Sequence, residues 1–319
     1  MLFRSALGQA GASIALPAKL LTALVASLPN ETVTIQTHEN MSATVRAGAA
    51  EYTLMGLPGD EYPATPEFEA LQTLTLDGEE LLTALTRVDF AASDDEARMM
   101  LCGVCLDVEA ECLTLVSTDT HRVAAATVPL LAVEAGDDAT WAAVLPSRVA
   151  TALRKALKES EGDIDLAIGA ALVSITIDDL TILGRVIEGK FPAWRRTIPQ
   201  ESDATTTITL HPGAAMGAID RNSLIARMES NKVILTTLEG GGVQLHAQSE
   251  AGAAKETLPG AVTGAPIEIG FNAGYLHDVL NVLESESVVI GLTTPTHPMR
   301  ITGQGIDGYV CVVMPMQIL

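Results

Sequence analysis

A short pattern of apolar and polar positions recurs five times along the chain. Each copy begins with a brief apolar strand, passes through a Pro, Gly, Asn or Asp position, and then shows a one-sided apolar stripe at helical period. The stripes are Leu20, Leu21, Leu24, Val25 and Leu28; Leu81, Leu82, Leu85 and Val88; Val149, Leu153 and Leu157; Ala215, Met216 and Ile219; and Tyr275, Leu276, Val279, Leu280 and Leu283. The copies start roughly 60 to 70 residues apart, a spacing in the range of repeated units.

Helix starts and further strands complete each copy. Asp77, Ser147 and Asn272 stand directly before three of the stripes, where a side chain can cap the first turn. Several short β-branched strands follow each helix, for example residues 33–36, 164–166 and 243–245. We therefore predict an α+β fold of repeated βαβββ half-domains, each of which must pair with a neighbour to bury its apolar face.

Polar joints near residues 64–68 and 200–204 divide these copies. The predicted domains are 1–68, 69–200 and 201–319. The first holds one repeat and the other two hold a pair each.

Composition limits the class of protein. Of the 319 residues, 48% are hydrophobic but only 3% are aromatic, so aliphatic side chains must fill the cores. No apolar run approaches the ~20 residues that a membrane helix needs, and the first residues lack an export signal, so we expect a cytoplasmic protein that binds no membrane. Cys102 and Cys105 lie in an alternating strand pattern with no second ligand pair, which predicts neither a metal nor a cofactor.

The sequence has 40 acidic and 19 basic residues, a net charge of −21. This charge argues against binding to nucleic acid unless the basic residues lie together on one face of the protein. On the predicted helix after Ser147 they do, because Arg148, Lys155 and Lys158 lie opposite the apolar stripe and Arg154 lies on its flank. Together with Lys19, Arg87 and Arg98 they suggest contact with an anionic backbone without sequence readout.

The densest polar cluster is Thr118, Asp119, His121 and Arg122, between two apolar strands. It can be a turn whose side chains hold the backbone. It can also be a hydrolase site, with Asp119 and His121 as base and Thr118 or Ser117 as nucleophile. Because no oxyanion motif, phosphate loop or metal set accompanies the cluster, we assign no catalytic residue.

Four segments carry a family resemblance. Residues 118–122 (TDTHR) resemble a T-D-G-H-R-L corner, 189–199 (GKFPAWRRTIP) a G-[RK]-F-P-x-[YW]-x-x-[VL]-[IL]-P linker, and 309–319 a Y-V-V-M-P-M-R-L ending; 269–272 (IGFN) match the start of a last half-domain. From about Ser13 to its end, the chain resembles the bacterial DNA polymerase sliding clamps, the β subunits of polymerase III.

The resemblance implies three domains of two repeats each, and two chains that close head to tail into a ring around duplex DNA. The seven basic residues named above would then face the DNA. Tyr52 and Leu54 of one chain would meet Ile219 and Leu224 of the other. The implied partners are duplex DNA without sequence specificity, DNA polymerase III, clamp loader subunits, other proteins with a clamp-binding motif, and a second copy of the chain.

The resemblance also implies a pocket for short partner peptides between the second and third domains. Carried over by position, it comprises Leu101, Thr118, Thr120, His121, Arg122, Val123, Pro192, Arg196, Thr197, Val312, Val313, Met314, Pro315, Met316, Gln317 and Ile318. Methionines in such a slot can adapt to several peptides.

Three departures accompany the resemblance. Thr120 replaces a glycine, which predicts strain if that position needs a positive φ. The tail reads Met-Gln-Ile-Leu at 316–319, without the family's cation. The family's first half-domain has no counterpart, so we expect exposed apolar surface on the first repeat. A natural short clamp and an incomplete gene product both remain open, and the alternative function is an incomplete clamp that binds peptides without closing a ring.

Overall fold

The computed structural model describes residues 13–64, 66–109, 111–134 and 140–318. The chain divides into two compact units, Met1–Glu67 and Phe68–Leu319. Each unit is described by itself below.

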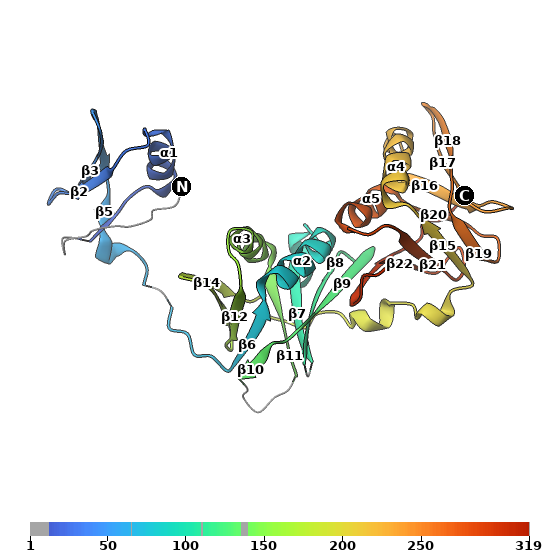
Figure 1. Cartoon of the computed structure of the whole chain (residues 1–319), viewed down its shortest axis with the longest axis horizontal. Helices are drawn as coiled ribbons and strands as arrows, with labels where there is room; N and C mark the ends of the chain where they lie inside the picture. Colours follow the sequence, from blue (N-terminus) through green and yellow to red (C-terminus); the bar gives the residue numbers. More distant parts are fainter. Residues whose placement is uncertain (1–12, 65, 110, 135–139, 319) are drawn as a thin grey trace. The chain divides into compact units, whose positions relative to one another are not determined.

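The first unit is one βαβββ repeat with a short addition. Its elements are β1 (Ile14–Ala15), α1 (Ala18–Ser27), β2 (Val33–Thr37), β3 (Ser42–Ala47), β4 (Ala50–Met55), β5 (Leu57–Pro58) and the 3-10 turn η1 (Gly59–Glu61). Strands β2, β3 and β4 form an antiparallel sheet, and β1 pairs with β5 (Figure 1). The small core holds Leu28, Val45, Ala47 and Leu54.

The first unit also exposes many large apolar side chains, in agreement with the expectation from the sequence. They are Leu20, Ile35, Tyr52, Met55, Leu57 and Tyr62. Leu20 belongs to the predicted helical stripe of α1, yet it is 55% exposed, while Val25 on the same helix is buried. Only part of the stripe is therefore covered.

The second unit contains four more repeats, as predicted. They are β6 (Gln72–Asp77), α2 (Gly78–Val88), β7 (Gly103–Glu109), β8 (Cys112–Thr118) and β9 (Arg122–Pro129); then β11 (Thr140–Pro146), α3 (Ser147–Leu157), β12 (Asp163–Ile168), β13 (Leu172–Ile177) and β14 (Leu180–Arg185); then β15 (Thr206–Leu210), α4 (Pro212–Ala226), β16 (Lys232–Thr237), β17 (Val243–Ser249) and β18 (Gly252–Leu258); then β20 (Glu268–Asn272), α5 (Ala273–Val282), β21 (Val288–Leu292), β22 (Met299–Gly303) and β23 (Tyr309–Val313). Short pieces connect them: β10 (Ala132–Glu134), β19 (Ala261–Gly264) and the 3-10 turns η2 (Asp89–Ala91), η3 (Glu96–Leu101), η4 (Trp194–Thr197) and η5 (Glu201–Asp203).

Neighbouring repeats exchange their first strands. Strand β6 joins the sheet of β12, β13 and β14, while β11 joins β7, β8 and β9. In the same way β15 pairs with β21, and β20 pairs with β16. Each helix therefore packs on a sheet that includes a strand from the neighbouring repeat. For this reason one repeat cannot form a closed core by itself.

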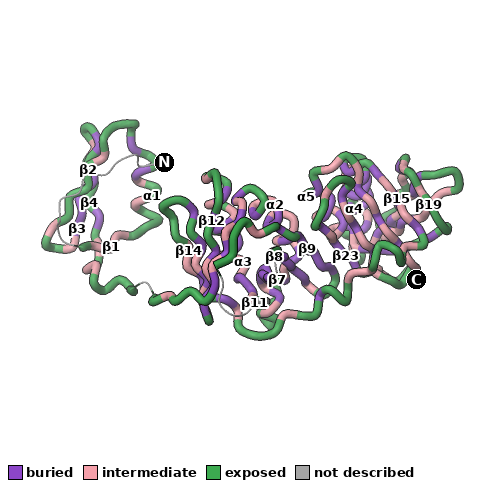
Figure 2. The backbone as a smooth tube through the Cα atoms, turned by 60° about the horizontal axis from the view of Figure 1, so that its bottom comes forward, coloured by how far each residue is buried: buried purple, intermediate pink, exposed green. Residues whose placement is uncertain are grey.

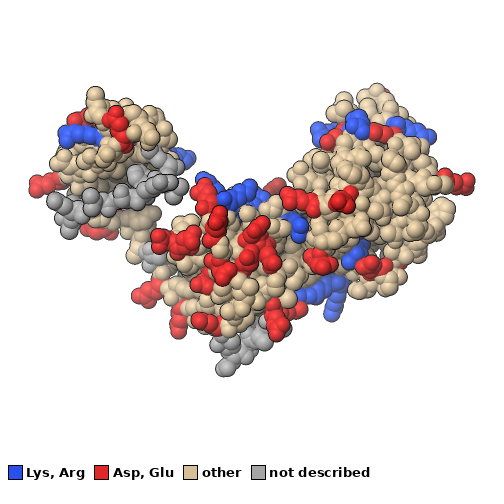
Figure 3. All heavy atoms as spheres, in the orientation of Figure 1, with Lys and Arg blue, Asp and Glu red and all other residues tan. Residues whose placement is uncertain are grey.

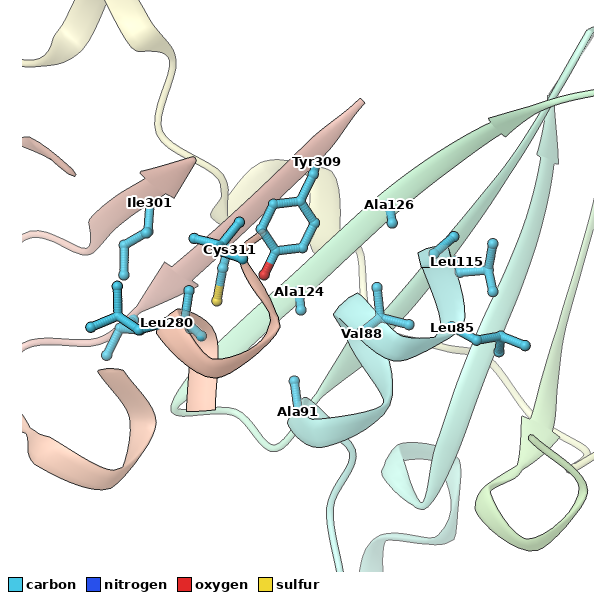
Figure 4. Packing of buried hydrophobic residues seen from close by; sticks show 14 of the residues in the cluster. Leu85, Val88, Ala91, Leu115, Ala124, Ala126, Leu280, Ile301, Tyr309 and Cys311 are labelled. Carbon is cyan, nitrogen blue, oxygen red and sulfur yellow. The ribbon is translucent and has the colours of Figure 1, made fainter. Parts of the chain in front are cut away.

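A single nine-stranded sheet, in the order β11-β7-β8-β9-β23-β22-β21-β15-β19, runs through the second unit. Its central junction is the antiparallel pairing of β9 with β23, from Tyr309 opposite Ala126 to Val313 opposite Arg122. The buried cluster is continuous across this junction: Figure 4 shows Val88 and Leu85 of α2 near Ala124 and Ala126, with Tyr309, Cys311 and Leu280 following. The tube view shows the same buried strands through the unit (Figure 2).

Two of the three predicted helix caps are confirmed. The side chain of Asp77 accepts from Glu80 N, and that of Asn272 accepts from Gly274 N. The prediction for Ser147 was wrong: Pro146 occupies the N-cap position, and the Ser147 hydroxyl donates to Cys102 O at 3.1 Å. A proline already holds the extended backbone that a cap requires.

Among the described residues, no helix is both long and apolar enough to cross a membrane.

Candidate functional site

The polar corner, residues 118–122, is a turn between β8 and β9 that its own side chains hold in place. The Thr118 hydroxyl donates to Arg122 O at 2.7 Å and accepts from Thr120 N at 3.1 Å. Asp119 Oδ1 accepts from the backbone N–H groups of His121 and Arg122, at 2.9 and 3.0 Å. These side-chain hydrogen bonds satisfy backbone groups of the turn that have no partner on a neighbouring strand.

Thr120 stands at the tip of this corner with φ +79°. A β-branched residue rarely adopts that left-handed conformation, which a glycine accepts without cost. The strain expected from the sequence is therefore present. The Thr120 hydroxyl also accepts a hydrogen bond from Arg98 Nη1 at 3.2 Å.

The Arg122 side chain is the centre of the corner and is only 10% exposed. Its guanidinium donates to Asp119 Oδ2 at 3.0 Å, to Asp278 Oδ2 at 2.6 Å and to Phe90 O at 2.7 Å. The same cation lies over the ring of Tyr275 at 4.6 Å and over that of Phe90 at 5.2 Å. One buried cation thus joins the turn, η2 and α5.

Three of these partners were missed in the sequence. Phe90, Tyr275 and Asp278 lie far from residues 118–122 along the chain, and no local spacing relates them to Arg122. Burial and Asp119 raise the pKa of the Tyr275 phenol, so this ring stays neutral beside the cation. Only the tertiary structure could reveal this set.

The geometry does not assemble the alternative hydrolase site. Asp119 is engaged by Arg122, and the His121 ring stacks on Tyr275 with centroids 6.2 Å apart. The Thr118 hydroxyl donates to a carbonyl, and Ser117 is fully buried. Within the described residues no hydrogen bond joins His121 to either hydroxyl, whereas a nucleophile and its base should lie within such reach.

The tail, residues 314–318, runs from this corner to the last repeat. Met314 N donates to His121 O, and Met316 N donates to Gly270 O, each at 2.8 Å. Lys232 Nζ donates to Gln317 O at 3.3 Å. A lysine from β16 therefore brings a positive charge beside the tail position where the family has a cation and this chain has glutamine.

The residues assigned to the peptide pocket separate into three groups by burial. Thr118, Leu101, Arg122, Val123, Val312 and Val313 are buried. Pro192, Arg196, Thr197, Thr120, His121, Met314, Gln317 and Ile318 are exposed, and Pro315 and Met316 are intermediate. The exposed residues come from the corner, the tail and the linker, whereas buried Val123, Val312 and Val313 belong to strands β9 and β23 of the sheet and buried Leu101 ends the 3-10 turn η3.

The linker, residues 189–199, packs on the same sheet. Phe191, Trp194 and Ile198 cover Val123, Val312 and their neighbours in a second buried cluster. Trp194 Nε1 donates to Asp107 Oδ2 at 3.1 Å. The linker is thus fixed against β7 and β9 rather than free.

The basic residues predicted to face DNA occupy different surroundings. Arg148 and Lys155 of α3 and Lys158 at its C-cap are exposed, and basic side chains gather over this helix in Figure 3. Arg154 is paired with Asp89 at 3.3 Å. Burial raises the pKa of the Asp89 carboxyl, while Arg154 opposes that shift.

The remaining three cations lie elsewhere. Lys19 is exposed on α1 of the first unit, and Arg87 of α2 lies over Tyr309 at 5.9 Å. Arg98 is in the 3-10 turn η3, where it binds Asp95 and Thr120 at the corner.

The four residues assigned to the subunit contact also differ in exposure. Tyr52 and Leu224 are 43% and 66% exposed. Leu54 and Ile219 are buried in the cores of their own units. Leu54 points inward because side chains alternate along β4, and Ile219 lies on the inner face of α4.

The described residues contain no cluster of His, Cys, Asp and Glu suited to a metal ion. All four cysteines are free thiols. Burial raises the pKa of Cys105 and of Cys311 to about 12, so both remain protonated.

Comparison with known proteins defines the class first: the fold is that of the DNA polymerase sliding clamps. The chain is similar to the sliding clamp of Pseudomonas aeruginosa bound to griselimycin, with a TM-score of 0.89 and 26% identity over 96% of this chain and 81% of that one. It is also similar to the sliding clamp of Bacillus subtilis, with a TM-score of 0.87 and 28% identity over 96% and 80%.

Sequence comparison gives the family. Residues 5–66, 75–193 and 195–317 match the N-terminal, central and C-terminal domains of the DNA polymerase III beta subunit. The Beta sliding clamp of Halalkalibacterium halodurans is 31% identical over 310 residues, which cover 96% of this chain and 80% of the relative. The chain belongs to the DNA polymerase III β subunits, the bacterial sliding clamps, as the motifs had indicated.

Proposed function

We propose that this chain is a non-catalytic processivity factor of the cytoplasm: two copies close head to tail around duplex DNA and tether the replicative polymerase. The family match along three successive segments is the observation that carries the proposal. The domain division at 1–68, 69–200 and 201–319 accompanies it. The start of the second compact unit at Phe68 supports the first boundary, and the polar joint at residues 200–204 supports the second.

The exposed cations of α3 support contact with the DNA backbone. Arg148 and Lys155 stand on the face of the helix opposite its buried Ala150, Leu153 and Leu157, and Lys158 follows at the C-cap. A ring holds DNA topologically, so a few phosphate contacts suffice and the net charge of −21 does not oppose binding.

The decisive experiment is retention on circular DNA. The whole chain is loaded with clamp loader and ATP onto nicked circular duplex and passed through a sizing column, before and after linearisation. A ring stays with the circle and is lost from the linear DNA. A chain that elutes from both forms alike contradicts encirclement and leaves the incomplete clamp that only binds peptides.

Variants test which face meets the DNA. The double substitution Lys155→Glu and Lys158→Glu should lower loading and reduce the slope of log affinity against log salt by about 0.9 for each phosphate that is no longer neutralised. Lys255→Glu on β18 is the matched control, because this lysine is exposed on a strand away from α3. Equally weakened loading in both variants would contradict the role of α3.

Light scattering tests assembly. A mass near twice 33.4 kDa that persists on dilution supports the dimer. We propose Tyr52 and Leu224 as its contact residues, since both are exposed apolar side chains. Leu224→Asp should shift the mass toward one chain, and the exposed Leu180→Asp on β14 serves as control. A dimer that withstands Leu224→Asp would refute this contact.

We also propose that partner peptides bind at the corner and tail. Met314 is 41% exposed beside His121, and Pro315 and Met316 continue the same surface. Griselimycin, the ligand of the Pseudomonas aeruginosa clamp, is the probe. Met314→Ala should weaken its binding about tenfold, equivalent to the ~1.4 kcal/mol expected when part of a methionine side chain no longer packs on the ligand, whereas Leu180→Ala should not.

A further inference from the structure

A cavity of about 430 Å³ lies between the linker and the sheet. Cys105 of β7 and Ala142 and Val144 of β11 form its floor, and Phe191 and Trp194 of the linker form its wall. These strand positions alternate with Val104, Leu106 and Leu145, which belong to the core beneath the helices. The linker cavity is therefore on the sheet face that carries no helix.

Its surface is largely apolar and holds two of the chain's few aromatic side chains. The Cys105 thiol stays protonated, and a neutral buried thiol behaves as a small apolar group. The volume of the linker cavity falls in the range of roughly 300–1,000 Å³ that small-ligand sites occupy. An apolar side chain therefore has both the space and the surroundings to bind here.

Asp107 is the one carboxylate among the described residues that line the cavity, and it is already compensated. Asp107 Oδ2 accepts from Trp194 Nε1 at 3.1 Å and from Arg195 Nη1 at 2.5 Å. Arg195 Nη2 also pairs with Glu109 at 3.0 Å, and its guanidinium lies 4.4 Å over the Trp194 ring. This network fixes the indole and covers one of its faces, which leaves less of the ring available for stacking on a nucleic-acid base.

Two further cations line the cavity, Lys190 and Arg196. Both are exposed, and neither side chain makes a hydrogen bond or ion pair with any residue in the described part of the chain. In a protein of net charge −21, a pair of cations that no described residue compensates, beside an apolar cavity, favours a ligand that carries an anionic group.

We propose that the linker cavity is a second peptide-binding site, which takes a bulky apolar side chain with a carboxylate next to it. The inference rests on the proposed function, because the occupant is a further segment of the same partner proteins. Pro192 and Arg196 line this cavity, and both are also among the residues that the family resemblance assigns to the peptide pocket. One extended partner segment can thus occupy both places.

Trp194 provides a direct readout. Trp141 is the only other tryptophan, so Trp141→Phe leaves Trp194 as the sole indole emitter in the whole chain. The probe is acetyl-Ala-Asp-Phe-Ala-amide, compared with the same peptide carrying Asn for Asp or Ala for Phe. We expect a saturable emission change with the first peptide. Either replacement should weaken it about tenfold, the effect of losing one charged hydrogen bond or a buried side chain.

Two variants locate the binding. Ala142→Phe introduces a ring into the cavity from an exposed position, so it should abolish the signal without unfolding the chain. Lys190→Glu should weaken the Asp-Phe peptide about tenfold and the Asn-Phe peptide little. Met314→Ala, placed at the tail, should leave the signal unchanged, which separates this site from the proposed peptide surface.

The results that overturn the inference are definite. They are equal binding of the Asp and Asn peptides, an unchanged signal in Ala142→Phe, or a Trp194 response to oligo-dT but not to peptide. Loss of retention on circular DNA with an intact Trp194 signal would refute the ring and leave this site standing.

Discussion

Removing the buried cation at the corner should destabilise the second unit more than any nearby substitution. Arg122→Met keeps the length of the side chain but leaves the Asp119 carboxylate and Phe90 O without their guanidinium partner. Breaking a buried pair costs about 3–5 kcal/mol. Asp278 is 40% exposed, so water can replace the lost guanidinium as its partner. We therefore expect a loss of stability at the lower end of this range, about 3 kcal/mol.

For a unit of this size, each kcal/mol lowers the melting temperature by about 2–4 °C, so Arg122→Met should melt about 6–12 °C lower. Thermal unfolding followed by circular dichroism measures this shift. Asp278→Asn is the control and should cost less than about 1 kcal/mol, because only the exposed arm of the network changes. If Arg122→Met melts within a degree of the parent chain, the guanidinium does not stabilise this junction and the reasoning fails.

Thr120→Gly should raise the melting temperature of the second unit by about 2–4 °C, because it removes roughly 1 kcal/mol of left-handed strain; a lower value would show that the Arg98 bond outweighs the strain. Iodoacetamide at pH 8 should modify Cys112 well before Cys105, whose pKa of about 12 keeps it a thiol, and peptide mapping that finds Cys105 modified first would contradict this. The backbone N–H of Ala97 is the main cause of the lowered pKa of Asp95 and Arg98 a lesser one, so in Arg98→Ala the Asp95 carboxyl should still titrate by NMR below its ordinary value. The stabilisation from this carboxylate is present above the ordinary pKa and is lost as the pH falls through the lowered one.

Local patterns predicted the elements well. The apolar stripes located the five helices, and Asp77 and Asn272 marked two of their starts, because period and capping act within a few residues. The Ser147 cap failed for an equally local reason, since Pro146 takes that position and the Ser147 hydroxyl finds a partner on another segment.

Contacts across long stretches of chain were not predictable in the same way. Asp278 stands 156 residues from Arg122, and nothing in either segment indicates the pair. The exchange of first strands between repeats depends on how whole repeats pack together, and the sequence of a single strand does not indicate it. Arg98 could be grouped with the other cations by charge alone, but only the structure shows it bonded to Thr120.

The pairing of β9 with β23 has a consequence for the folding of the protein during its synthesis. During translation, Arg122–Pro129 leaves the ribosome long before Tyr309–Val313 exists. Until then β9 presents an open strand edge, and such edges recruit other chains. The nascent protein therefore depends on its last residues to close the sheet, and a ribosome stalled before Tyr309 would release an aggregation-prone product.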